Sequence, residues 1–223
     1  MTDRWVDFFS RQGAFGPEWL RHAVDHWRHN EILFGMIQRY FEPGSRILDI
    51  GCGPGFTCCY LASCGFEVTG VDNDPTILGK AKDLSTRLGI PVRYQQANAF
   101  DLKPFHGEFD LVMSSGVLEH FDREVTIQLL QEQSHCAAHV LIAIPTAYTR
   151  FAAPITDERI YSMKGLRRLV ADAGMTVKSH FGFGDVTVTP PQIWLRRLLP
   201  RGFYRTLQNI GYAFSIAVLA ERP

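Results

Sequence analysis

The chain lacks several features that would assign it to a specialised class of protein. Its 23 basic and 23 acidic side chains cancel, so there is no net charge to attract nucleic acid or an anionic membrane nonspecifically. The longest apolar run, YAFSIAVLA, is interrupted by Ser215 and is too short to span a bilayer. The first residues, MTDRWVDFF, lack the basic start and apolar centre of a signal peptide. These absences predict a cytoplasmic protein with no integral membrane segment.

Cysteine is also scarce, and its pattern does not suit a metal or a disulfide framework. Four of the five cysteines are Cys52, Cys58, Cys59 and Cys64, with no C-x-x-C pair and no histidine at finger spacing. Three histidines, His22, His26 and His29, share one helix face and have the spacing of metal ligands, but no carboxylate completes the set. We therefore expect a polar stripe rather than a metal, and a reducing environment.

What is present is the composition of an ordinary globular protein. Of the 223 residues 46% are hydrophobic and 21% are charged, and this length suits one α/β domain with an additional element. Charge is unevenly divided along the chain. Residues 1–149 carry 12 basic and 18 acidic side chains, whereas residues 150–223 carry 11 and 5. This asymmetry predicts that the two parts face different partners.

Periodicity divides the chain into a helical start and a strand-helix alternation. Residues 1–42 are crowded with aromatic side chains and are expected to form a helical cap or lid before the Pro43-Gly44 stop. Residues 43–223 are expected to form the main domain, with a helical insertion at 184–210 between the last two strands. Strands are expected at 46–50, 66–71, 91–95, 109–113, 139–144, 175–181 and 213–220. Helices are expected at 56–64, 75–87, 122–137 and 162–173.

The most informative motif is the glycine loop ILDIGCGPGF at residues 47–56. Its glycines allow a tight turn and a close approach to a ligand, and the helix that follows offers unpaired N–H groups. A dinucleotide fingerprint would place its third glycine at Phe56, and the G-K-[ST] of a P-loop is absent. Asp72, at the end of the second strand, suits a ribose, and Asp49 suits an ammonium group. The loop therefore predicts a site for a nucleoside that carries an amino acid.

These motifs resemble those of the class I S-adenosylmethionine-dependent methyltransferases that act on small molecules. The resemblance covers about residues 40–182 and the last strand, and it rests on D-x-G-x-G-x-G (49–55), VTGVDNDP (68–75), QANAFDL (96–102), FDLVMSSGVLEHF (109–121) and VLAERP (218–223). It implies a Rossmann-like, doubly wound α/β fold whose seven strands lie in the order 3-2-1-4-5-7-6, the seventh antiparallel. It also implies S-adenosylmethionine as cofactor.

The resemblance further implies a role for individual residues. Gly51, Gly53 and Gly55 would line the methionine end, Asp49 would organise the amino group, Asp72 would hold the ribose, Asn73 would follow the adenine face, Asn98 with Ala99 would take the place of an adenine-binding Asp, and Ser115 would pass close to the sulfonium. Glu119-His120 matches the E-H pair of the family. His120 is the candidate catalytic residue, and its alternative role is that of a structural histidine with its bonds satisfied.

The expected activity is methyl transfer to a small molecule. Four arginines in the insertion, Arg196, Arg197, Arg201 and Arg205, are interleaved with aromatic residues and favour an anionic, partly apolar acceptor. They could instead form a solvated basic helix face. The alternative functions are a noncatalytic S-adenosylmethionine-binding protein and, more remotely, a nicotinamide-dependent oxidoreductase. Nucleic acid is a poor candidate because no N/D-P-P-Y/F motif follows the fourth strand, and TPPQ (189–192) lies elsewhere.

Overall fold

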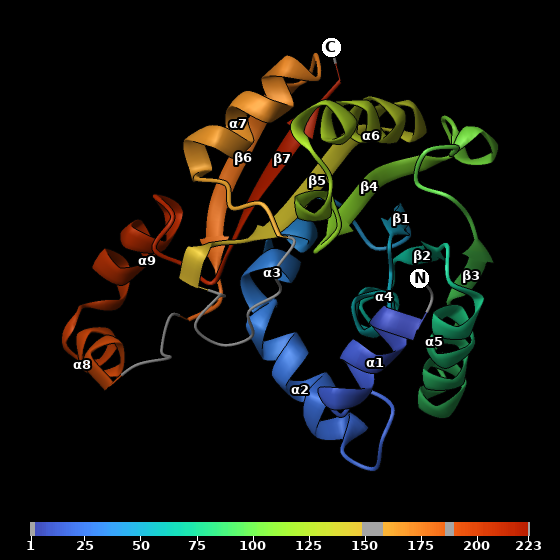
Figure 1. Cartoon of the computed structure of the whole chain (residues 1–223), viewed down its shortest axis with the longest axis horizontal. Coiled ribbons are helices and arrows are strands. Elements are labelled where there is room, and N and C mark those ends of the chain that lie inside the picture. The colour runs from blue at the N-terminus through green and yellow to red at the C-terminus, as the bar shows by residue number, and fades with distance from the viewer. Residues whose placement is uncertain (1–2, 149–157, 186–189, 223) are drawn as a thin grey trace.

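The fold is a single twisted sheet with helices on both faces, seen in Figure 1. A computed structural model describes residues 3–148, 158–185 and 190–222. The strands are β1 (Arg46–Ile50), β2 (Glu67–Asp72), β3 (Arg93–Gln96), β4 (Phe109–Ser115), β5 (Ala137–Pro145), β6 (Thr176–Phe183) and β7 (Ser215–Glu221). Their order is β3-β2-β1-β4-β5-β7-β6, and β7 runs antiparallel to both neighbours. The predicted fold class and strand order are confirmed.

Each expected strand forms, with its ends shifted by a few residues. No strand start is shifted by more than two residues, and β3 begins at Arg93 rather than at Pro91. Proline has no N–H to donate to a neighbouring strand, so it is poorly suited to that position in the ladder.

The crossover helices begin where the sequence places their caps. They are α4 (Phe56–Ser63), α5 (Pro75–Leu88), α6 (Arg123–Cys136) and α7 (Met163–Asp172), with short 3-10 turns η1 (Lys103–Phe105) and η2 (Leu118–His120). The Asp74 carboxylate accepts the Thr76 and Ile77 N–H groups, and Asp122 accepts that of Val125. Such caps satisfy N–H groups that have no partner inside the helix.

Alternate residues of the central strands pack into apolar clusters on opposite faces of the sheet. On β5, Leu141 and Ala143 join α3 and α4 on one face of the sheet, whereas Val140 and Ile142 join α6 and α7 on the other. Because side chains alternate along a strand, a strand buried on both faces reads as the continuous apolar run seen at 139–144.

The N-terminal region forms three helices, α1 (Asp3–Arg11), α2 (Trp19–His29) and α3 (Glu31–Tyr40). In α3, Leu33, Phe34 and Ile37 are fully buried in the core against the sheet. Helix α1 instead lies beside α5 at the edge of the molecule. Within residues 1–42, therefore, α3 is structural and α1 is the part best placed to act as a lid.

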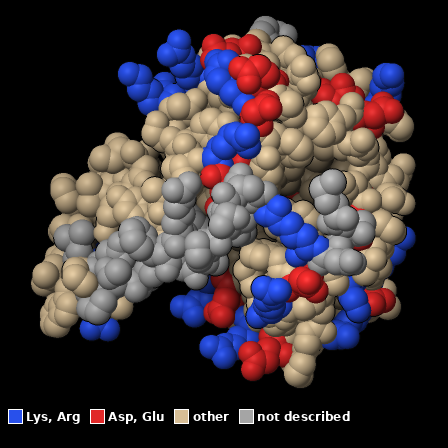
Figure 2. All heavy atoms as spheres, viewed as in Figure 1, with Lys and Arg blue, Asp and Glu red and all other residues tan. Residues whose placement is uncertain are grey.

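The insertion between the last two strands contains α8 (Pro190–Leu198) and α9 (Arg201–Asn209), which extend to one side in Figure 1. Tyr204 and Gln208 anchor α9 and are 3% exposed, whereas Trp194 and Leu198 on α8 are 63% and 74% exposed. On the face seen in Figure 2, acidic and basic side chains are intermixed over the main body. Among the described residues, no helix is both long and apolar enough to cross a membrane.

Candidate functional site

A cleft opens at the carboxyl ends of β1, β2 and β4, where the strand order reverses direction. The space between its walls, including the open solvent at its mouth, is about 920 Å³. The lining residues are Trp5, Phe9, Ile50, Gly51, Gly53, Val71, Asp72, Asn73, Ile77, Ala97, Asn98, Ala99, Phe100, Ser115, Gly116, Val117, His120 and Phe121. Open α/β sheets bind ligands at this kind of switch point.

Most of the residues expected to bind the cofactor line this cleft. Gly51, Gly53, Asp72, Asn73, Asn98, Ala99 and Ser115 do so, and so does the catalytic candidate His120. Two expected residues, Asp49 and Gly55, are not among the lining residues, although both belong to the loop region.

The glycine loop adopts a conformation that other residues rarely take. Gly51, Gly53 and Gly55 have φ values of +67°, +53° and +81°. Gly55 precedes α4, and a Cβ there would collide with the Tyr94 hydroxyl and press on the Ala81 Cβ. Gly55 therefore serves the packing of α4, α5 and β3, while Gly51 and Gly53 face the cleft.

Asp72 joins the loop to the second strand. Its Oδ2 accepts the Gly53 N–H at 3.1 Å and its Oδ1 accepts the Asp74 N–H at 3.1 Å. Burial raises the pKa of this carboxyl, and the two N–H bonds oppose that rise. A carboxylate oxygen can accept more than one hydrogen bond, so both oxygens retain capacity for ligand hydroxyl groups.

Asp49 lies behind the loop, in the core. It is 3% exposed, and its Oδ2 accepts the Cys58 S–H at 3.2 Å. Burial raises its pKa to about 7, with a further contribution from the charge of Asp72. Asp49 is thus buried in the core beside a thiol and does not line the cleft.

The raised pKa of Asp49 leads to a pH-dependent prediction. Between about pH 4 and pH 7 only the folded state keeps this proton, because the carboxyl titrates near 3.8 when unfolded and at about 7 when folded. Stability therefore falls as the pH rises through this window, by about 1.4 kcal/mol per pH unit and up to roughly 4 kcal/mol. Asn at this position stays neutral. Asp49→Asn should raise the thermal midpoint over the parent protein, and the gain should grow from pH 5 to pH 7 and then stay constant.

Calorimetry of both proteins at several pH values would test this expectation. The matched control is Asp101→Asn, because Asp101 is an exposed carboxylate outside the cleft lining. A gain that does not change with pH would show that Asp49 is charged in the folded protein.

The rim of the cleft combines two amides with aromatic rings. Asn73 and Asn98 are exposed, and the Asn98 Oδ1 accepts the Phe100 N–H at 3.1 Å. Phe100 is itself 48% exposed and meets the ring of Phe121 edge to face, with 5.6 Å between centroids. The rim thus offers amide groups beside a flat apolar surface.

His120 approaches the cleft from the other side, on η2. It is half-buried, and its ring meets that of Trp5 edge to face at 5.0 Å between centroids. Its imidazole nitrogen and the carboxylate oxygens of Glu119 and Glu158 all lie within 4.8 Å of one another. An imidazole between two carboxylates can hold and move a proton.

The sequence predicted a cap or lid in residues 1–42 but did not identify which aromatic side chains of α1 line the cleft. Trp5 and Phe9 line the cleft, and a Cβ on Gly53 would lie 3.1 Å from the Phe9 ring. The signal was present in the aromatic content of residues 1–42, but it did not distinguish helix packing from contact with a ligand.

The basic insertion, by contrast, contributes no described residue to the cleft lining. The Arg196 guanidinium lies 4.5 Å from the Tyr204 ring centroid, and its Nε pairs with Asp185 at 3.4 Å. Arg205 donates to the Gly182 carbonyl at 2.8 Å. Arg205 thus ties α9 to β6, whereas Arg196 contacts residues within the insertion itself.

The histidines of α2 have separate partners. His22 Nδ1 lies 3.0 Å from the Gln12 carbonyl oxygen, and His26 Nε2 lies 3.0 Å from the Thr57 hydroxyl. Burial lowers the pKa of His26 to about 3, which keeps this ring neutral. His29 lies against Phe183 and Phe214.

Comparison with known proteins shows that the chain is similar to methyltransferases. Residues 47–138 match the model of the methyltransferase domain family. Over 122 residues the chain is 32% identical to a ubiquinone biosynthesis O-methyltransferase of Xanthomonas axonopodis, a match covering 54% of this chain and 46% of that protein. The ubiquinone biosynthesis O-methyltransferase of Azorhizobium caulinodans is 38% identical over 127 residues, a match covering 50% of each chain. The chain thus spans about half the length of the curated relatives it matches.

Solved structures share the fold over most of the chain. Magnesium protoporphyrin IX methyltransferase from Synechocystis, solved with bound S-adenosylhomocysteine, has a TM-score of 0.65 at 16% identity, covering 90% of this chain and 84% of that one. A [4+2]-cyclase has a TM-score of 0.64 at 16% identity, covering 87% and 80%. At this identity the likeness concerns the fold, and the cyclase illustrates that one fold hosts different reactions.

Proposed function

Since residues 47–138 match the methyltransferase domain model and the sheet has the strand order implied by the resemblance, we propose that this protein transfers a methyl group from S-adenosylmethionine to a small molecule. The observation that carries the proposal is the pairing of the Asp72 carboxylate with the Gly51–Gly53 turn at one end of the cleft. This arrangement suits a ligand that has ribose hydroxyl groups at one point and an amino acid at another.

The residues present fit that donor. Asp72 would accept the ribose hydroxyl groups, and Gly51 and Gly53 would let the methionine part approach the backbone, since neither has a side chain to block it. Asn98 and Phe100 would border the adenine. When bound, the donor supplies a methyl group that its sulfonium has already activated, so the protein has mainly to align the acceptor and exclude water.

The surroundings of His120 favour an acceptor with an apolar, flat body and a hydroxyl group. Trp5, Phe9 and Phe121 supply an aromatic wall beside the imidazole. The names of the curated relatives support oxygen as the methylated atom, because both are O-methyltransferases. The anionic character predicted from the insertion has no support from the cleft lining, and it stays a prediction from sequence.

In the proposed reaction His120 is the general base. Its imidazole accepts the hydroxyl proton as the oxygen forms its bond to the methyl carbon, and the carbon–sulfur bond breaks to leave a neutral thioether. Glu119 and Glu158 would stabilise the resulting imidazolium, because opposite charges at this distance favour the protonated ring.

His120→Ala should therefore lower the turnover number by about 10² or more while changing the affinity for S-adenosylhomocysteine less than threefold. The matched control is His180→Ala, because His180 is exposed on β6 and does not line the cleft. Turnover would be measured with labelled S-adenosylmethionine and a panel of phenols and catechols. An unchanged turnover number would assign His120 to a structural role.

The same measurements separate the alternatives. Binding of S-adenosylhomocysteine without turnover on any acceptor would favour a noncatalytic S-adenosylmethionine-binding protein. Tryptophan quenching by NADH, with none by S-adenosylhomocysteine, would favour the oxidoreductase. Trp5 is the reporter for both ligands because it lines the cleft.

A further inference from the structure

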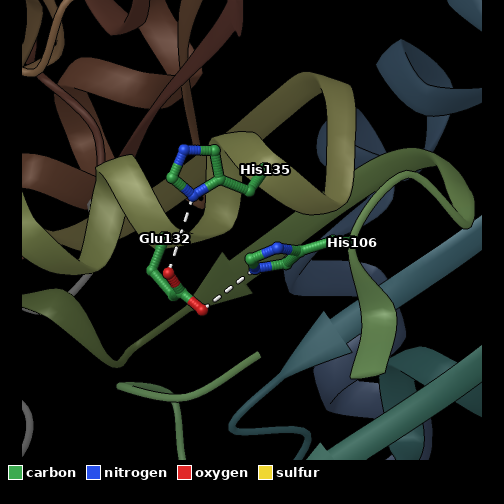
Figure 3. Close-up of side chains that lie close together, drawn as sticks. All are labelled: His106, Glu132 and His135. Atoms are coloured by element: carbon green, nitrogen blue, oxygen red, sulfur yellow. Dashed lines mark hydrogen bonds and ion pairs between the residues drawn. The ribbon is translucent and has the colours of Figure 1, made fainter. Parts of the chain in front are cut away.

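Side chains from two segments of the chain meet near the end of α6, and none of them lines the cleft (Figure 3). His106 follows η1, and Glu132 and His135 lie one turn apart on α6. His106 Nε2 lies 3.1 Å from Glu132 Oε1, and His135 Nδ1 lies 3.6 Å from Glu132 Oε2. Both imidazole rings point toward the carboxylate in Figure 3.

We propose that His106, Glu132 and His135 form a binding site for a divalent transition metal, with Zn²⁺ as the ion they suit best. Two imidazoles and one carboxylate are a donor set that zinc accepts, with water in the fourth position. The three ligand atoms all lie within 4.8 Å of one another. Ligands about 2.0–2.2 Å from a tetrahedral ion lie roughly 3.4 Å apart, so a small rotation of the side chains completes the site.

The carboxylate is held in place for this role. Glu132 Oε1 accepts the Leu102 N–H at 2.8 Å in addition to its contact with His106. Ligand groups fixed by surrounding hydrogen bonds bind metals more tightly than free ones.

The neighbouring thiol does not compete as a ligand. Cys136 follows His135 on α6 and is buried, with its Sγ directed at the Leu102 and Glu132 carbonyl oxygens. The thiol hydrogen is directed at these two carbonyl oxygens rather than at the imidazole rings, so the set we propose consists of the two histidines and Glu132.

The position of the site connects it to the cleft. Asn98, Ala99 and Phe100 line the cleft, and the same segment continues through Leu102 to His106. An ion held between His106 and α6 would fix both the far end of this segment and the helix behind it. Metal binding should therefore also tighten the binding of S-adenosylhomocysteine, and this second effect rests on the proposed function.

Titration of the full chain with Zn²⁺, followed by calorimetry and thermal unfolding, tests the site. At a hundredfold excess over the dissociation constant, the thermal midpoint should rise on the order of 5–10 °C. His135→Gln and His106→Gln should each lose at least tenfold in Zn²⁺ affinity and most of this rise. Co²⁺ should give the absorption of a tetrahedral site in the parent protein alone.

The matched control is His139→Gln. His139 Nε2 also lies near a carboxylate, 3.6 Å from Glu221 Oε1, but its partner is Lys178 rather than a second histidine. This variant should bind Zn²⁺ as the parent does. Equal Zn²⁺ binding by the parent and His135→Gln would overturn the proposal, as would no binding by the parent.

A further measurement separates this proposal from the proposed function. If Zn²⁺ binds and S-adenosylhomocysteine does not bind at all, the metal site stands and the proposed function fails. If both bind and neither changes the affinity for the other, the coupling through residues 98–106 is overturned, because linkage between two sites is reciprocal.

Discussion

Asp72→Ala is expected to remove most of the thermal stabilisation that S-adenosylhomocysteine gives the parent protein. A ligand that binds only the folded state raises stability by mass action, so weaker binding shows directly as a smaller shift. The substitution would remove the proposed acceptor of two ribose hydroxyl bonds, each worth about 1.5–3 kcal/mol when the acceptor is charged. We expect a loss of affinity of about 10² or more, measured by calorimetry and by the thermal shift.

The same carboxylate also accepts the Gly53 and Asp74 N–H groups, so the loop itself changes in this variant. Asp72→Asn serves as the comparison, because it keeps the size of the side chain and one oxygen acceptor while losing the charge. It should bind the ligand with an affinity between those of the parent and Asp72→Ala. If Asp72→Ala binds as tightly as the parent, the donor site lies elsewhere.

Gly53→Val is expected to be nearly as damaging to donor binding. Gly53 has a φ of +53°, which a β-branched residue adopts only with strain, and its new Cβ would lie 3.1 Å from the Phe9 ring. Relief of that strain moves the turn that borders the cleft, displaces α1, or does both. We expect a loss in affinity for S-adenosylhomocysteine of about 10-fold to 10²-fold with the circular dichroism spectrum retained.

Gly89→Val provides the control for strain without contact. Gly89 ends α5 with a φ of +66°, and a Cβ there would have no atom within 4 Å. It should lose a comparable amount of thermal stability, since the backbone penalty is the same, while binding the ligand normally. Retained binding in Gly53→Val would show that this turn does not contact the donor.

The sequence by itself determined the order of the elements and the chemistry of the loop. The start of α5 at Pro75 and the Asp122 cap of α6 depend on hydrogen bonds within a few residues, and the positive φ angles at Gly51 and Gly53 depend on the backbone freedom of glycine. These local preferences and bonds depend on neighbouring residues in the chain, so periodicity and spacing predict them. Asp72 could also be predicted, because the end of the second parallel strand lies beside the end of the first whenever the sheet is doubly wound.

The tertiary structure alone decided which of these residues face the ligand and which face the core. Asp49 and Gly55 belong to the same motif as Gly53, yet Asp49 contacts Cys58 and Gly55 makes room for Tyr94, 39 positions further along the chain. The placement of Trp5 over His120 depends in the same way on contacts between distant segments.

The histidines also show that spacing in the sequence does not decide which side chains meet. His22, His26 and His29 have the spacing of ligands, but different neighbours hold each ring, whereas His106 has no such spacing and meets Glu132 and His135 across the fold. Spacing places side chains on one face of one helix, and only packing between elements decides what that face meets. The direction of a side chain relative to distant segments is set by the whole sheet, and a local sequence pattern does not contain it.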